Sequence, residues 1–540
     1  MDDLLGPPDE VVDAVVVGAG VAGMYMVHRL RGLGLSVQGF EAGSDVGGTW
    51  YWNRYPGARC DVLSVDYSYS FSGELQQEWD WSERYATQAE ILAYLEHVAD
   101  RYGLRRSFAF DTRVVAARLD EATLRWRVRT DTGRTLDARF FILATGSLSS
   151  ASVPDIPGLD DFAGDWYHTG QWPHEGVDCA GRRIGVIGTG SSGIQSIPVL
   201  AEAAEHLFVF QRTPNYTVPA RNRPLSDAER AEIKANYDDR RRRSRASGGG
   251  SVHEPYPKSA LEVSEDERRA IYEEGWKAGG VLFAKTFPDQ LTTLEANETA
   301  RAFVAAKIRA VVKDQAVADL LVPNDHPIGT KRICTDSYYF ETFNRDNVTL
   351  VDVRSAPIVA ITPEGIRTTE ADYALDTIVF ATGFDAMTGS VLRIDIRGRG
   401  SVALADVWAG GPRTYLGLSI SGFPNLFVMT GPGSPSVLAN MILAAEHHAD
   451  WITECIAYLK SIEALAIEAT EKAQDDWVAY SNELAEQTLF PATNSWYVGA
   501  NIPGKPRTFM PFIGGLGTYR TICAGIAERN YEGFRVVAAT

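Results

Sequence analysis

The sequence lacks an excess of basic residues, a cysteine framework and a long apolar run. Its 540 residues hold 52 Lys and Arg against 70 Asp and Glu, a formal net charge of −18, which argues against nucleic acid or an anionic membrane as a bulk partner. Five cysteines occur without a Cys-x-x-Cys pair, so neither a disulfide framework nor a zinc site is expected. Glycines and Asp13 interrupt the best apolar stretch well short of a spanning helix, so we expect no stable membrane association.

The first residues also lack the pattern of a secretory signal. They are acidic and include Pro7 and Pro8, where a signal peptide has a basic start and an apolar core. Together with the scattered cysteines, this predicts a cytoplasmic protein. The sequence implies no metal and no protein partner. A chain of 540 residues is too long for a single core, so several domains are expected.

A glycine-rich loop follows a strand near the start of the chain. The β-branched run Val11–Val17 predicts a buried parallel strand, and Gly18-Ala19-Gly20-Val21-Ala22-Gly23 then opens a helix expected to reach about Gly32. Gly18, Gly20 and Gly23 let the backbone approach a pyrophosphate at the helix N-terminus, and Glu41, at the end of the next predicted strand, suits a ribose with free hydroxyls. FAD or NAD fits this pattern, and the alternative is a turn that merely needs glycine.

A second loop repeats the same order of elements. The apolar run Ile184–Ile187 precedes Gly188-Thr189-Gly190-Ser191-Ser192-Gly193, a predicted helix to about Ala204 and a strand at Leu207–Phe210. Gln211-Arg212-Thr213 then replaces the acid. An acid would repel a 2′-phosphate, whereas Arg212 can bind it through two hydrogen bonds, so the first loop indicates FAD and the second NADPH.

The region between about Ser226 and Leu321 reads as a charged helical insertion. Ser226 with Glu229 and Ser264 with Glu267 have capping-box spacing, and Asn297 is a candidate cap for a third helix. The basic run at 240–243, with Arg245, suggests nucleic-acid binding, but in so acidic a chain we favour a solvated helix face followed by a mobile loop.

Four further motifs point to one family. In chain order, they are Gly-Gly-x-Trp followed by Tyr-Pro-Gly and Asp61 at 47–61, Phe-x-Gly-x-x-x-His-x-x-x-Trp-Pro at 162–173, Lys331-Arg332, and Asn494-Ser495-Trp496. In this order, and with both glycine loops, nearly the whole chain resembles the type I Baeyer–Villiger monooxygenases, most closely the phenylacetone and steroid monooxygenase branch.

The resemblance implies a reaction and a set of residues. NADPH would reduce FAD, O2 would add to give a flavin peroxide, and this would convert a ketone to an ester or lactone, with bulky, aryl or steroid-like ketones expected by analogy. Arg332 matches the catalytic arginine and Asp61 the carboxylate that holds it. The other matches are Gly48, Thr49, Trp50, Tyr55 and Asp61 against the flavin, Lys331, Arg212 and Thr213 at the 2′-phosphate, Trp496 on the loop that contacts NADP, and Leu438 and Met441 beside the substrate.

The predicted fold is α/β, with two Rossmann-like dinucleotide-binding domains for FAD and NADP and a helical insertion in the NADP domain. The expected boundaries are 1–150 and 385–540 for the FAD domain, 151–220 and 329–384 for the NADP domain, and 221–328 for the insertion, with a substrate-covering loop near 494–505.

Other interpretations stay open at this stage. An N- or S-oxygenating flavin monooxygenase would share both loops, and a non-catalytic dinucleotide sensor would bind without turnover. A disulfide reductase is excluded because no cysteine pair follows the first loop. Arg332 is alternatively a surface ion-pair member and Asp61 a simple cap. For His168 we favour a structural or hinge role over a general base.

Overall fold

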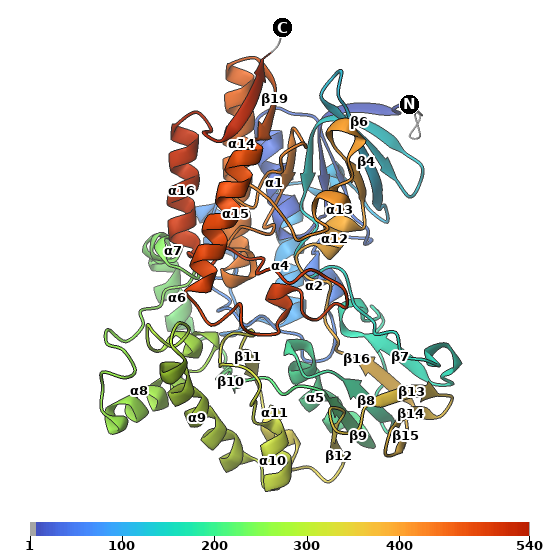
Figure 1. Cartoon of the computed structure of the whole chain (residues 1–540), viewed down its shortest axis with the longest axis vertical. Helices are drawn as coiled ribbons and strands as arrows, with labels where there is room; N and C mark the ends of the chain where they lie inside the picture. Colours follow the sequence, from blue (N-terminus) through green and yellow to red (C-terminus); the bar gives the residue numbers. More distant parts are fainter. Residues whose placement is uncertain (1–6, 539–540) are drawn as a thin grey trace.

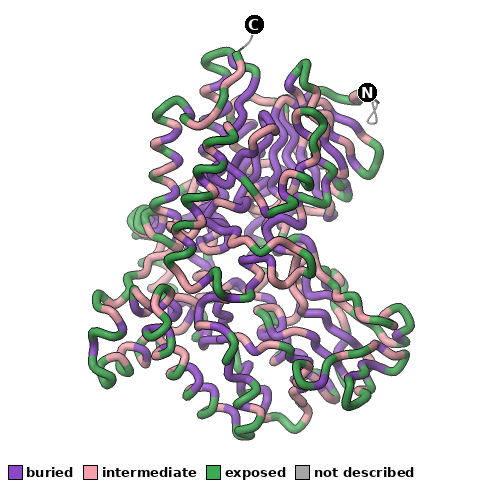
Figure 2. Tube along the Cα trace, viewed as in Figure 1, coloured by how far each residue is buried: buried purple, intermediate pink, exposed green. Residues whose placement is uncertain are grey.

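A computed structural model describes residues 7–538 as two sheet-centred bodies with helices around them, joined at a narrower middle (Figure 1). The buried segments gather inside these bodies (Figure 2). The predicted α/β class with two Rossmann-like units is confirmed. The exact boundaries near 150, 220, 328 and 384 stay predictions.

The first body is built on an eight-stranded sheet. Its spatial order is β17 (Asp395–Arg397), β4 (Val114–Asp120), β5 (Arg125–Thr130), β6 (Thr135–Leu143), β1 (Glu10–Val17), β2 (Val37–Phe40) and β3 (Phe108–Ala109), and β18 (Leu426–Val428) also pairs with β6. Strands β1, β2, β3, β6 and β18 pair in parallel, whereas β4–β5 and β5–β6 are antiparallel. The last four residues of the predicted first strand, Ala14–Val17, are almost fully buried, because the sheet is covered on both faces.

Helices from both ends of the chain cover this sheet. They are α1 (Val21–Gly32), α2 (Thr49–Trp52), α3 (Gly73–Glu78), α4 (Gln88–Arg101), α14 (Met441–Ser461), α15 (Glu471–Glu486) and α16 (Leu516–Glu528). Helix α1 packs against α14, so an N-terminal and a C-terminal segment share one core. The small antiparallel sheet of β19 (Ala464–Ala469) and β20 (Phe534–Ala538) closes the far end.

The second body has a five-stranded, wholly parallel sheet. Its order is β12 (Val348–Asp352), β9 (His206–Gln211), β8 (Arg183–Ile187), β16 (Thr377–Phe380) and β7 (Asp165–His168), with α5 (Ser191–Ala203) following the second glycine loop. The strands and helix predicted around this loop are therefore confirmed within one residue at each end. A three-stranded antiparallel sheet of β13 (Ile358–Thr362), β14 (Gly365–Thr368) and β15 (Asp372–Ala374) lies beside it.

The insertion is helical, as predicted. It contains α6 (Asp227–Ala235), α7 (Tyr237–Ala246), α8 (Glu265–Ala278), α9 (Leu294–Val311) and α10 (Gln315–Leu321). Ser226 and Glu229 form a complete capping box, and Ser264 accepts from the backbone N–H of Glu267. The prediction for Asn297 is wrong. It lies inside α9, buried, where its side chain donates to the carbonyl oxygens of Gln290 and Ile328.

The interpretation of the basic run as a solvated helix face is wrong in part. Arg240 binds both oxygens of the buried Asp66, and Arg241 is buried, donating to Gln76, Ser68 and the carbonyl oxygen of Asp66. Only part of the run is solvated, since Arg242 is 74% exposed. Helix α7 is thus fastened to the first body through charges that composition alone assigns to the surface.

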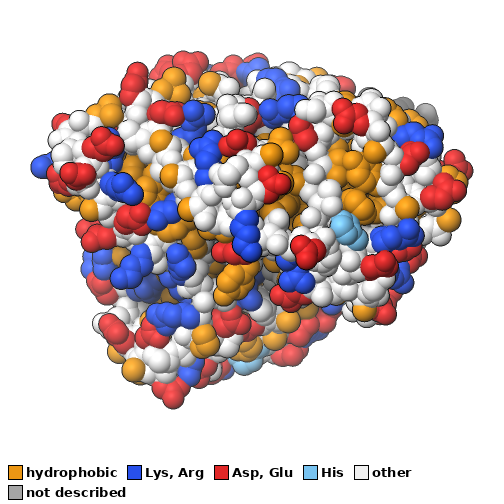
Figure 3. Space-filling view, turned by 90° about the horizontal axis from the view of Figure 1, so that it is seen from below, with side chains coloured by type: hydrophobic (Ala, Val, Ile, Leu, Met, Phe, Trp, Pro, Cys, Tyr) orange, Lys and Arg blue, Asp and Glu red, His pale blue; other side chains and the backbone are white. Residues whose placement is uncertain are grey.

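No helix among residues 7–538 combines the length and apolarity needed to cross a membrane. Acidic and basic side chains are interspersed over most of the face seen from below (Figure 3).

Candidate functional site

The two glycine loops repeat one close approach. A Cβ at Gly18 would lie 2.5 Å from the carbonyl oxygen of Ala144, and one at Gly188 would lie 2.5 Å from that of Ala381. Both glycines have positive φ, so a side chain would be strained as well as blocked. Each loop therefore turns tightly over the end of the neighbouring strand, β6 in the first body and β16 in the second.

The first loop meets the aromatic run 47–61 directly. A Cβ at Gly48 would lie 2.7 Å from Cα of Gly20, so two bare backbones face each other at the start of α1. Glu41 is buried and accepts from the backbone N–H groups of Ala19 and Gly43 at 2.7 and 2.8 Å. This surface, free of side chains and next to a helix N-terminus and an acid, fits the pyrophosphate and ribose of FAD.

The aromatic residues of this run are fixed by hydrogen bonds. Thr49 and Trp50 lie in α2, whose backbone carbonyl at Trp50 accepts from Gln88, and the indole N–H of Trp50 donates to Tyr67. Tyr55 donates to Gln195 of α5 at 2.8 Å. The turn at Gly57 is equally close to α5, since a Cβ there would lie 2.4 Å from the carbonyl oxygen of Gln195. The run thereby connects the two bodies, a role for Gln195 that no sequence motif signalled.

Arg332 and Asp61 are brought together although they lie 271 residues apart in the chain. Nε of Arg332 donates to Oδ2 of Asp61 at 2.6 Å and Nη2 donates to Oδ1 at 2.8 Å, a bidentate pair. The third guanidinium nitrogen, Nη1, donates to the carbonyl oxygen of Val437 at 2.9 Å. The side chains are 30% and 20% exposed, so the pair is neither a surface contact nor a wholly buried one.

The surroundings keep this guanidinium charged. Burial lowers the pKa of Arg332, but the Asp61 carboxylate more than offsets it, and the pKa lies above its ordinary value. Tyr497 lies near the same guanidinium, and burial raises the pKa of its phenol to about 12, against the opposing effect of Arg332. A permanent cation with a neutral phenol beside it can stabilise an anion that forms during a reaction. Tyr497 directly follows Trp496, but its role had no signal in the sequence.

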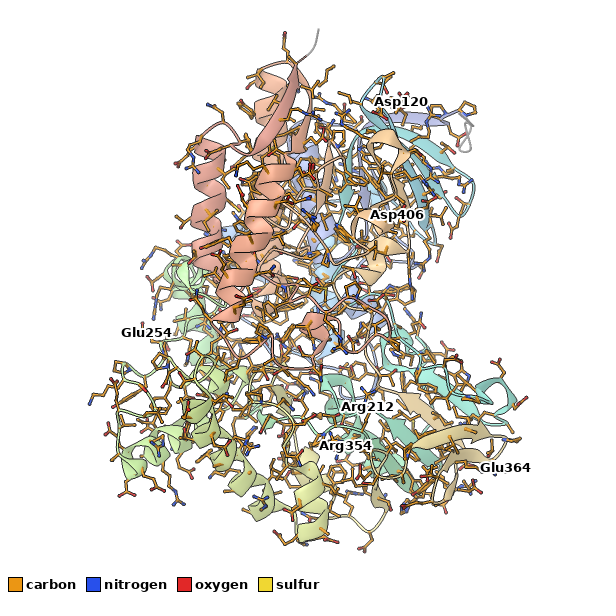
Figure 4. All side chains as sticks on the ribbon, viewed as in Figure 1. Asp120, Arg212, Glu254, Arg354, Glu364 and Asp406 are labelled. Carbon is orange, nitrogen blue, oxygen red and sulfur yellow. The ribbon has the colours of Figure 1, made fainter. Side chains whose placement is uncertain are left out.

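Of the two cations expected at the 2′-phosphate, Arg212 lies at the carboxyl end of β9 and Lys331 lies in the segment just before β11 (Cys334–Asp336). Arg212 follows β9 directly and is exposed. Burial of Lys331 lowers the pKa of its amino group, and the neighbouring charge of Arg212 lowers that pKa further. Asp325 lies 3.8 Å from Lys331 and 3.5 Å from Arg354, which follows β12. Figure 4 shows Arg212 and Arg354 near each other at this end of the sheet. Arg354 was missed, because the pairing of its strand with β9 is a property of the fold and not of the local sequence.

The second glycine loop is open on its outer side. A Cβ at Gly190 would meet nothing within 4 Å, whereas one at Gly193 would lie 2.2 Å from the carbonyl oxygen of Gly188. Thr189 donates to the carbonyl oxygen of Thr213 at 2.9 Å, and Ser191 lies 3.2 Å from Sγ of Cys334. Ser192 lies in the first turn of α5, and no side chain caps the N-terminus of this helix. An uncapped helix N-terminus beside a glycine loop fits a second pyrophosphate.

An apolar cluster adjoins Arg332 and contains the predicted substrate residues. Leu438, Met441 and Trp496 pack with Val437 and Tyr497, so the cluster is continuous with the pair of Arg332 and Asp61 through Val437. The loop at 494–505 forms only a short 3-10 turn at Trp496–Val498. It is attached to the segment 384–386, where Lys505 donates to Asp385 and to the carbonyl oxygen of Ala386.

His168 is the last residue of β7 and lies beside two segments of chain, near Ser152 and near Gly383. Its Nδ1 accepts from the backbone N–H of Gly170, and the ring meets Phe384 edge-on. Beside it, Ser152 and Gly383 are joined by a backbone hydrogen bond. Burial lowers the pKa of His168 to about 4, which makes it a neutral structural group at neutral pH. The hinge role favoured for His168 remains a prediction.

Comparison with known proteins agrees with this geometry. Residues 12–238 match the family model described as pyridine nucleotide-disulphide oxidoreductase. A Baeyer-Villiger monooxygenase from Pseudooceanicola batsensis is 44% identical over 96% of this chain and 95% of its own. The chain belongs to the Baeyer–Villiger monooxygenase family. It is therefore an oxidoreductase.

Solved structures of the family superpose over the whole chain. An oxidised steroid monooxygenase bound to NADP is 63% identical with a TM-score of 0.94, covering 98% of this chain and 100% of that one. A complex of OTEMO with FAD and NADP is 42% identical with a TM-score of 0.95 and the same coverage. A phenazine N-monooxygenase from Lysobacter antibioticus is 42% identical over 97% of this chain and 96% of its own.

Proposed function

We propose that the protein is an NADPH- and O2-dependent flavin monooxygenase that converts ketones to esters or lactones and prefers bulky, aryl or steroid-like ketones. The observation that carries this proposal is the bidentate pair of Arg332 and Asp61 beside the apolar cluster. The likeness to a steroid monooxygenase supports the substrate preference.

Once bound, NADPH would supply the electrons and FAD would activate O2, which provides the oxygen atom. The chain's own residues bind and orient them: Gly20, Gly48 and Glu41 on one side, and Gly190, Arg212 and Lys331 on the other. Arg332 holds a positive charge in a space that the apolar cluster shields from water, and Asp61 fixes the plane of that charge. Trp496 and its loop cover the same space.

The test is product identification by mass spectrometry with purified holoenzyme, NADPH and O2, across small, cyclic, aryl and steroid ketones. Esters with incorporated oxygen, formed faster from the bulky and aryl ketones, are expected. Efficient conversion of small ketones alone would contradict the substrate preference, and NADPH oxidation without any ester would contradict the reaction.

A second candidate is N- or S-oxygenation, favoured by the similarity to a phenazine N-monooxygenase. Amines and sulfides in the same panel separate the two. Oxidised nitrogen or sulfur products without esters would establish this alternative.

A further inference from the structure

A buried hydrogen bond joins two threonines that lie 163 residues apart in the chain. The hydroxyl of Thr493 donates to the hydroxyl oxygen of Thr330 at 2.9 Å. Thr330 gives its own proton to the carbonyl oxygen of Pro327 at 2.7 Å, so toward Thr493 it can only accept. Thr330 is 0% and Thr493 is 4% exposed, so water does not compete for this bond.

The segment that contains Thr330 carries two cations of the site. Lys331 and Arg332 follow Thr330 directly. Two residues before it, Ile328 is held through both of its backbone groups: its N–H donates to the side-chain oxygen of the buried Asn297 at 2.9 Å, and its carbonyl oxygen accepts from the amide of the same residue at 2.8 Å. The segment is therefore fixed to the helical insertion, which makes Thr330 a fixed point for the side chain that binds to it.

The loop that contains Thr493 carries the aromatic residues beside the site. It follows α15 and crosses the narrower middle of the molecule (Figure 1). The carbonyl oxygen of Thr493 accepts from the backbone N–H of Ser495 at 2.8 Å, and the carbonyl oxygen of Ser495 accepts from that of Val498 at 3.2 Å. These consecutive hydrogen bonds connect Thr493 to the short 3-10 turn Trp496–Val498, whose first two residues pack in the apolar cluster. The position of Thr493 therefore sets the position of this turn.

We propose that Thr330 and Thr493 are positioning residues, whose bond holds the loop against the segment of Lys331 and Arg332 during turnover and so keeps water from the activated oxygen. This inference rests on the proposed ketone oxygenation. In that reaction the two electrons of NADPH, with H+, reduce one atom of O2 to water, and the other atom is inserted into the C–C bond beside the ketone carbonyl. When water enters, the same two electrons reduce O2 to H2O2 and the C–C bond stays intact.

Thr493→Val tests this bond because it removes the donor, keeps the branched shape and leaves no buried donor unpaired, since Thr330 still binds Pro327. With NADPH, O2 and an aryl ketone, the FAD-loaded variant should show an about fivefold lower ratio of ester to H2O2, the change expected for the loss of one neutral hydrogen bond. Thr493→Ser retains the hydroxyl and should keep the wild-type ratio. Thr488→Val is the matched control, because the hydroxyl of Thr488 donates to the carbonyl oxygen of Ala485 at the end of its own helix.

Hydrogen exchange measured by mass spectrometry gives a second readout, which needs no turnover. In FAD-loaded Thr493→Val, the amides of residues 495–500 should exchange about fivefold faster than in the wild type, whereas those of α14 and β16 should exchange at the wild-type rate. In a protein that already carries Thr330→Val, the change Thr493→Val should add nothing to either effect, because the acceptor is gone.

A wild-type exchange rate or a wild-type product ratio in Thr493→Val would overturn the proposal. Faster exchange throughout the chain would overturn it as well, since the hydroxyl would then act on global stability and not on the loop. The same holds if Thr493→Val has equal effects with and without the hydroxyl of Thr330. If the wild type forms no ester from any ketone, the proposed function itself fails, and the exchange rates still decide whether the two threonines fix the loop.

Discussion

Replacing Asp61 by Asn tests whether the carboxylate positions the cation at the centre of the site. The variant keeps the size of the side chain but removes its charge, and it replaces one of the two oxygens that accept from Arg332 by an amide that cannot. One charge-assisted hydrogen bond is lost outright and the other is weakened. At roughly 1.5–3 kcal/mol for each such bond, the ester-forming kcat/KM should fall about 100-fold.

The same change should lower stability less than it lowers activity. Surface ion pairs contribute about 0–1 kcal/mol and breaking a buried pair costs about 3–5 kcal/mol. The pair of Arg332 and Asp61 is partly exposed, so we expect a loss of about 2 kcal/mol in the free energy of unfolding. Denaturant unfolding of the FAD-loaded protein measures this term separately from turnover.

The assay follows ester product and, separately, the bleaching of the flavin by NADPH without oxygen. Asp372→Asn is the matched control, because Asp372 also pairs with an arginine, Arg367, but on an exposed hairpin. That control should keep wild-type product formation. Wild-type kcat/KM in Asp61→Asn would refute the reasoning that a fixed guanidinium is required.

Three further outcomes follow from the same contacts. Arg212→Ala should raise KM for NADPH by about 10–100-fold while leaving that for NADH unchanged, because only the 2′-phosphate contact is removed; equal effects on both cofactors would contradict this. Arg241→Met should cost ~2–4 kcal/mol in denaturant unfolding because its three buried acceptors lose their donor, whereas the exposed Arg242→Met should stay within ~0.5 kcal/mol. The pKa of His168 is lowered to about 4 in the folded protein, against 6.5 in the unfolded chain, so the unfolded chain binds the proton first as the pH falls. The free energy of unfolding should therefore be at its full value above pH 6.5 and fall by up to ~3 kcal/mol toward pH 4. His168→Asn should flatten that decline, and an unchanged pH profile would contradict the assignment.

The sequence was most informative where local chemistry decides the structure. Gly18 and Gly188 lie where a side chain is excluded, and β8 contains the predicted run Ile184–Ile187, all of which is buried. The pairing of Asp61 with Arg332 was also anticipated, but through family resemblance rather than from the residues' own pattern. A local sequence pattern cannot predict a contact between segments so distant in the chain.

The errors came from the same limit. Asn297 and Arg241 have residue types typical of caps and solvated faces, yet tertiary contacts buried both. Arg354 and Tyr497 were missed because their neighbours, Asp325 and Arg332, are brought next to them only by the fold. No spacing along the chain encodes that a carboxylate or a guanidinium will lie next to them.

The place of β18 has a consequence for synthesis of the protein. It pairs with β6 through Leu426 and Phe141, while the whole five-stranded parallel sheet is encoded between them. At roughly 5–20 residues per second, β18 emerges from the ribosome tens of seconds after β6, and the second body is synthesised in between. During that interval the end of β6 at Phe141–Leu143 lacks its β18 partner, so the nascent first body should be the part that depends on chaperones, and early binding of FAD should shorten its exposure.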